Sequence, residues 1–110
     1  MEARQRRMTE NETLFREVNE RVEAIALVHG SDDHVYEFYC ECSNADCTVQ
    51  VCATLAVYER IRSDPTHFII APEHALPEIE RVVETTDEWW AVEKVGEAAA
   101  FAEERDPRAD

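Results

Sequence analysis

The chain has 110 residues, 45% of them apolar, with only two Gly and four Pro, which is the composition of one globular domain and excludes a low-complexity or disordered chain. Its net charge of −14 argues against nucleic acid as a partner, because affinity for phosphate backbones rests largely on cationic side chains. No apolar run reaches the ~18 residues of a membrane span and the N-terminus lacks the apolar core of a signal peptide, so we expect a cytoplasmic protein with no membrane partner.

The negative charge is unevenly distributed along the chain. Residues 1–30 carry five Arg and six Glu, whereas residues 31–110 carry six basic and nineteen acidic side chains. The acidic surface can be explained by solubility alone, and the more specific interpretation is that it binds a basic protein partner.

A long helix is predicted over residues 10–29, after a flexible basic arm of residues 1–8. Thr9 and Glu12 fit a capping box at its start, and Gly30 supplies a left-handed stop. Apolar residues at steps of three and four draw one stripe, which we expect to face the core, although so long a helix could also protrude and dimerise. The stripe consists of Leu14, Phe15, Val18, Val22, Ile25 and Val28, and the opposite face carries Arg16, Glu17, Glu20, Arg21 and Glu23.

A first β-hairpin is predicted from the alternation of residues 35–42 and the following strand at 48–53. In the first strand, one face carries Tyr36, Phe38, Cys40 and Cys42, and the other carries Val35, Glu37, Tyr39 and Glu41. In the second strand, we expect Val49 and Val51 to face the core and Cys52 to face solvent.

Next come a short helix capped by Thr54, a buried strand at 67–71 and a proline-bracketed loop at 72–77. Residues 78–95 fit either a helix or a second hairpin, and the β-branched run before the Trp89–Val95 segment favours the hairpin. We predict a terminal helix at 97–105 and a frayed tail at 106–110. The sequence therefore predicts a single α+β domain over residues 1–110.

Three cysteines lie within eight residues, at Cys40, Cys42 and Cys47. Alternate strand residues point to the same side ~6.5 Å apart, so the first two thiols can converge and Cys47 can fold back over them beyond a turn. Three thiolates suit Zn²⁺, which takes four ligands in a tetrahedron. A Cys40–Cys42 disulfide would be strained, and free thiols are the simpler alternative.

The fourth metal ligand is open between several residues. We favour His74, which follows the buried strand in the proline-bracketed loop. Cys52 is the second choice, followed by His67, by an open coordination position and by no metal. His29 and His34 are expected on the surface.

The chain resembles a family of short uncharacterised bacterial proteins, chiefly actinobacterial, over residues 11 to 108. The resemblance rests on the segments Glu10–Arg21, Cys40-Glu41-Cys42 with Asp46-Cys47, Leu55…Tyr58-Glu59…Arg62, and Phe68…Pro72-Glu73-His74. It implies a metal set of Cys40, Cys42, Cys47 and His74, with Cys52 as an addition of this sequence. Glu73 stands where the family more often has Gly, and Val57 where it often has Glu. The family carries no established activity.

Three functions remain open from the sequence. The first is a zinc-stabilised protein-binding or regulatory module, acting as a monomer or dimer with an unknown protein partner. The second is a small zinc-dependent enzyme with Glu41 or Glu73 as a base, or a redox-responsive protein using Cys52. The third is a nucleic-acid-binding regulator that uses the metal hairpin and the basic arm, and the net charge of the chain argues against it. No catalytic residue is assigned.

Overall fold

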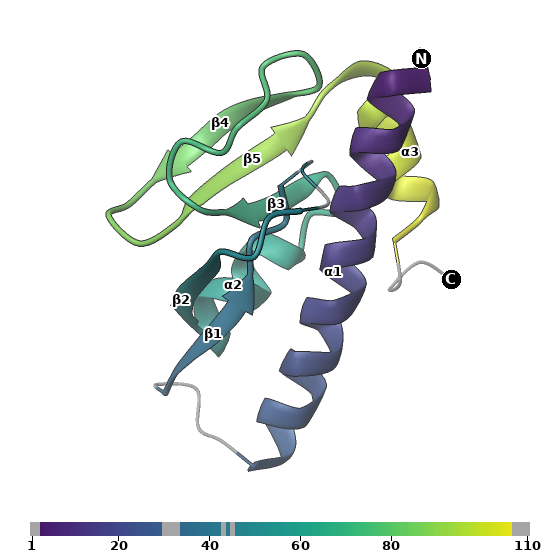
Figure 1. The fold of residues 1–110 in the computed structure, drawn as a ribbon. Coiled ribbons are helices and arrows are strands. Elements are labelled where there is room, and N and C mark those ends of the chain that lie inside the picture. The colour runs from purple at the N-terminus through teal and green to yellow at the C-terminus, as the bar shows by residue number, and fades with distance from the viewer. Residues whose placement is uncertain (1–2, 30–33, 43, 45, 107–110) are drawn as a thin grey trace.

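The fold is α+β, as the sequence predicts, with a long helix, two small antiparallel sheets and two shorter helices (Figure 1). The computed structural model describes residues 3–29, 34–42, 44 and 46–106, and the side chains of residues 26–29 are not described. The elements are α1 (Ala3–His29), β1 (Val35–Tyr39), β2 (Gln50–Thr54), α2 (Leu55–Arg62), β3 (His67–Ile70), β4 (Glu80–Thr85), β5 (Trp90–Lys94) and α3 (Gly96–Glu104). Within these described residues, no helix combines the length and hydropathy needed to cross a membrane.

Both predicted hairpins are present. Strands β1 and β2 pair antiparallel, with Phe38 opposite Val51. Strands β4 and β5 pair antiparallel, and β5 also pairs with β3, which gives the order β3-β5-β4. Residues 78–95 therefore form a turn and a hairpin rather than a helix.

The segment that follows β1 joins the two sheets. The amide of Cys40 donates to the Val49 carbonyl at 3.0 Å, which continues the first hairpin, and the amide of Glu41 donates to the Ile69 carbonyl at 2.8 Å. The chain thus leaves one sheet and contacts the other within two residues. This crossing places the cysteine segment between the sheets.

Helix α2 starts and packs as its sequence predicts. The Thr54 hydroxyl accepts a hydrogen bond from the Val57 amide at 3.2 Å, which caps the helix. Leu55, Tyr58 and Ile61 are buried, and the Tyr58 ring stacks on Phe38 with centroids 4.4 Å apart. An apolar core therefore lies between α2 and the strands.

Helix α1 begins earlier than predicted. It starts at Ala3, so most of the expected basic arm forms the first turns of the helix. Thr9 lies inside the helix, where its hydroxyl donates to the Gln5 carbonyl at 3.0 Å, and Glu12 is fully buried against Lys94. The predicted capping box is therefore wrong.

The buried face of α1 is polar, so the prediction that its apolar stripe faces the core is wrong for Leu14 and Ile25 and holds for Val22, which packs against the core. The residues that it buries are Thr9, Glu12, Thr13, Arg16, Asn19 and Glu23. By contrast, Leu14 is 57% exposed and Ile25 is 65% exposed. Figure 1 shows α1 running past both sheets, with α3 beside its N-terminal half. The helix thus buries mainly polar side chains against the rest of the fold and leaves Leu14 and Ile25 exposed.

Charged side chains from distant parts of the chain meet this polar face. Lys94, which is the only lysine in the sequence, forms ion pairs with Glu12 and Glu80, and all three side chains are fully buried. Burial raises the pKa of Glu12 well above its ordinary value, against the opposing effect of Lys94. These ion pairs attach α1 to β4 and β5.

Two arginines complete the interior network. Arg16 donates to the backbone carbonyls of Pro65 and His67, and its guanidinium lies 3.5 Å from the centroid of the Phe68 ring. Burial lowers the pKa of Arg16 to about 10. Arg62 on α2 pairs with Glu20 and Asp106. The buried polar groups of α1 therefore replace an apolar helix interface with ionic and hydrogen-bonded contacts.

Candidate metal centre

Three cysteines and one histidine converge beside the crossing segment. Cys40 and Cys42 follow β1, Cys47 lies on the way back to β2, and His74 belongs to the loop after β3. Their four candidate ligand atoms all lie within 4.8 Å of one another. The Nδ1 atom of His74 is 3.5 Å from the sulfur of Cys40 and 3.7 Å from that of Cys47. These four residues could together hold a metal ion.

Backbone hydrogen bonds set the positions of these side chains. The amide of Ala71 donates to the Cys40 sulfur at 3.1 Å, a contact that favours the thiolate form which metals bind. The His74 amide donates to the Ala71 carbonyl at 3.1 Å and so turns the loop back towards the cysteines. Ala71, directly after β3, therefore positions two of the four candidate ligands, Cys40 through its amide and His74 through its carbonyl.

The loop turn before His74 depends on an unusual backbone conformation. Glu73 has a φ of 69°, in the left-handed region that is costly for most side chains and easy for Gly. The conformation aims the next residue, His74, at the sulfurs, so Glu73 has a backbone role beside the site.

Cys47 is delivered by a turn on the other side. Its amide donates to the Asn44 carbonyl at 3.0 Å, and the Asn44 side-chain oxygen accepts from the Asp46 amide at 2.9 Å. Cys40 and Cys42 are buried, whereas Cys47 and His74 are half-buried. The cluster therefore has one side in the interior and one side towards the surface.

The thiols do not share the same acidity. A hydrogen bond with Cys40 lowers the pKa of Cys42, and the same contact, together with burial, raises the pKa of Cys40. Burial also raises the pKa of Cys47. Three thiolates so close together repel one another, and a bound cation would relieve that repulsion.

Glu41 lies between two candidate ligands and is fully buried. Its carboxylate accepts hydrogen bonds from the Ile69 amide at 2.9 Å, from the Asn19 side chain at 2.9 Å and from the Tyr58 hydroxyl at 3.3 Å. These donors belong to β3, α1 and α2, so Glu41 joins the cysteine segment to three elements. Alternation placed Glu41 on the same strand face as Glu37 and Tyr39, but β1 ends at Tyr39, so the alternation does not extend to Glu41.

The remaining sequence candidates lie outside the cluster. Cys52 is exposed on β2, as the alternation of that strand predicts, and His34 is exposed before β1. Val51 is buried as expected, whereas the same expectation for Val49 is wrong, because β2 begins only at Gln50 and Val49 is 44% exposed. His67 contacts Asp64 and Glu93 instead of the cysteines. The side chain of His29 is outside the described residues.

The chain stands apart in the comparisons. No protein-family model, no curated protein and no solved structure matches it. Any function must therefore be argued from the geometry of the fold.

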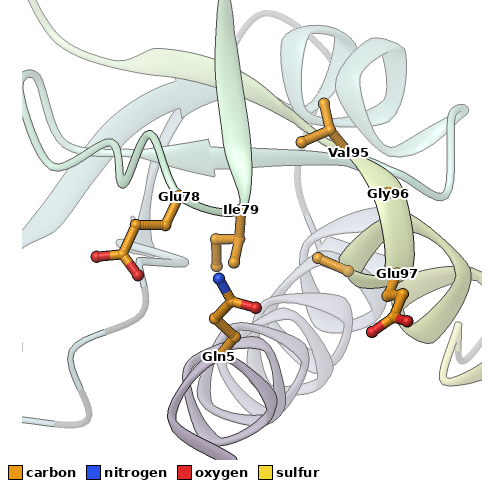
Figure 2. Close-up of a pocket in the computed structure, with 7 residues that line it drawn as sticks. Gln5, Glu78, Ile79, Val95, Gly96 and Glu97 are labelled. Atoms are coloured by element: carbon orange, nitrogen blue, oxygen red, sulfur yellow. The ribbon is translucent and has the colours of Figure 1, made fainter. Parts of the chain in front are cut away.

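A shallow hollow at the start of α3 is a second concave feature (Figure 2). It has a volume of about 270 Å³ and is lined by Gln5, Glu78, Ile79, Val95, Gly96, Glu97 and Ala98. None of these residues belongs to the cysteine and histidine cluster. Its ionisable groups are two carboxylates with no cation or nucleophile among the lining residues, so the hollow offers no set of groups for acid–base or nucleophilic catalysis.

Proposed function

We propose that this chain is a small zinc-stabilised protein-binding module, with Zn²⁺ held by Cys40, Cys42, Cys47 and His74. The observation that supports it is the convergence of four ligand atoms within 4.8 Å of one another. Soft thiolates with one imidazole are a ligand set that Zn²⁺ prefers. Four protein ligands fill a tetrahedron, which fits a structural ion better than a catalytic ion that needs an open position. Thiolate ligation also fits a reducing cytoplasm.

Native mass spectrometry of the untagged protein tests the zinc proposal. We expect one zinc ion per chain, and we expect its release by a strong chelator to lower the melting temperature, because metal binding is linked to folding. The Cys47→Ser variant should lose the ion. Purified protein that carries no metal and melts at the same temperature with and without chelator would contradict the proposal.

The protein-binding part of the proposal rests on the outer stripe of α1, defined as Leu14, Phe15, Val18 and Ile25. Leu14 and Ile25 are exposed, and Phe15 and Val18 are half-buried between them. Exposed apolar side chains along one side of a helix mark an interaction surface. The first 30 residues are almost neutral, whereas the rest of the chain carries a charge of −13. Two copies of the chain would therefore repel each other least through this helix. We propose a second copy of the chain as the occupant.

An antiparallel arrangement of the two helices suits their charges. Arg21 lies along the outer stripe and is exposed, as is Glu17 one turn earlier. A parallel pair would place Arg21 against its own copy, whereas an antiparallel pair brings each Arg21 near the Glu17 of the other copy.

Sedimentation equilibrium of Ile25→Glu tests this surface. Burying an Ile side chain is worth about 1.5–3 kcal/mol, and the twofold axis of a dimer doubles this to about 3–6 kcal/mol, so we expect the dimer to be weakened by roughly 10²- to 10⁴-fold. Val82→Glu is the matched control, because Val82 is 41% exposed on β4, outside the stripe. A wild-type protein that remains monomeric at high concentration would overturn self-association.

A further inference from the structure

A second group of metal-ligating side chains lies at the opposite end of β3 from the cysteine centre. It consists of Asp64 in the turn after α2, His67 at the start of β3, and Glu93 on β5 directly opposite His67. The Nε2 atom of His67 is 3.1 Å from one oxygen of Glu93 and 3.4 Å from one oxygen of Asp64. All three ligand atoms lie within 4.8 Å of one another.

Both carboxylates are oriented by groups outside the cluster. The Oδ1 atom of Asp64 accepts from the amide and the hydroxyl of Thr66, at 2.9 and 2.8 Å. The Oε1 atom of Glu93 accepts from the Arg81 guanidinium at 2.7 and 2.9 Å. In each case it is the other oxygen, Oδ2 or Oε2, that faces the same nitrogen of His67. Such outer contacts are the means by which proteins fix the direction of metal ligands.

The charge and exposure of the group suit a cation. Arg81 neutralises one of the two carboxylates, and the nearby Arg16 donates to backbone carbonyls at Pro65 and His67 instead of to Asp64. The His67 and Glu93 side chains are 24% and 27% exposed, and Asp64 is 46% exposed, so an ion and its waters can enter from solvent.

We propose that Asp64, His67 and Glu93 form a second metal site, for a divalent ion such as Mn²⁺ that accepts oxygen and imidazole ligands. Three protein ligands leave the remaining positions of a six-coordinate ion to water. The ligand set differs from the cysteine centre, because thiolates select soft ions and carboxylates accept harder ones. The two centres would thus bind different ions at the two ends of β3. A protonated His67 paired with both carboxylates is the competing arrangement, and it binds no metal.

Titration of the zinc-loaded protein with Mn²⁺, followed by electron paramagnetic resonance, tests the proposal. We expect one specific Mn²⁺ per chain and a loss of affinity of roughly tenfold or more in His67→Ala and in Asp64→Asn. Asp87→Asn is the matched control, since it removes the same charge from an exposed turn residue and should leave the affinity unchanged.

A second measurement guards against variants that fail to fold. Mn²⁺ should broaden the NMR signals of the His67 ring in the wild-type protein and in Asp87→Asn, at ratios below one ion per chain. Equal weakening in all three variants would show diffuse attraction to an acidic surface and overturn the proposal. Absence of broadening at His67, or no saturable binding in the wild-type protein, would overturn it as well.

Discussion

Replacing Cys40 with Ser is expected to abolish metal binding and to destabilise the whole domain. Cys40 is 1% exposed, receives the Ala71 amide on its sulfur and lies at the point where the chain crosses between the sheets. Structural zinc contributes about 10–16 kcal/mol in small zinc domains, and a domain of this size is stable by only about 5–15 kcal/mol. A loss of at least about 5 kcal/mol, and a melting temperature lower by about 20 °C or more, is therefore expected.

The chain supplies a matched control for this experiment. Cys52→Ser makes the same chemical change on the exposed side of β2, where the thiol is outside the cluster. Its stability should stay within about 0.5 kcal/mol of the wild-type value. Thermal unfolding by circular dichroism and metal analysis of both variants give the comparison. Equal melting of Cys40→Ser and Cys52→Ser would refute a structural metal.

The candidate metal centre was largely predictable because its signals are local. Alternation along one strand placed Cys40 and Cys42 on one side, and a short turn returned Cys47 to them. His74 was harder, since nothing local links it to the cysteines, and the clues were its place after a buried strand and the family resemblance noted from the sequence. The role of Glu41 was missed because the alternation stops where β1 ends, so Glu41 turns inward beside the cysteines that flank it.

The position of α1 shows what periodicity leaves undetermined. The helix was correctly expected, but along its sequence both a set of apolar residues and a set of polar residues recur with a period close to 3.6. The apolar face was expected inside, since burial of apolar area is the usual driving force. The polar face is inside because partners such as Lys94 and Glu41 meet it from distant parts of the sequence. A single sequence window contains no information on those partners.

The His67 group was missed for a similar reason. The sequence places Asp64 and His67 close together but gives no indication of Glu93, which reaches them only through the register of β3 with β5. The contacts of His67 with the two carboxylates depend on that pairing.

Lys94→Met is expected to destabilise the protein by about 3–5 kcal/mol, the usual cost of removing one partner from a buried ion pair. The substitution keeps most of the side-chain volume and leaves the carboxylates of Glu12 and Glu80 buried without their cation. Addition of Glu12→Gln should recover part of the loss, because it removes one of the stranded charges. Arg81→Met removes a cation that is 68% exposed and should cost less than about 1 kcal/mol.

The loss in Lys94→Met is also expected to depend on pH. Without the ammonium group, burial raises the folded-state pKa of Glu12 further, so the folded state binds more protons than the unfolded chain above about pH 4.3. Stability then falls as pH rises, and the difference from the wild-type protein should be larger at pH 8 than at pH 5. Urea unfolding at pH 5 and at pH 8 measures this difference in stability, and an equal loss at the two pH values would mean that Lys94 contributes through packing alone.

Acylation of the ε-amino group of Lys94 in the wild-type protein gives an independent readout. Because Lys94 is buried and is the only lysine in the sequence, it should react with amine reagents only when α1 separates from β5.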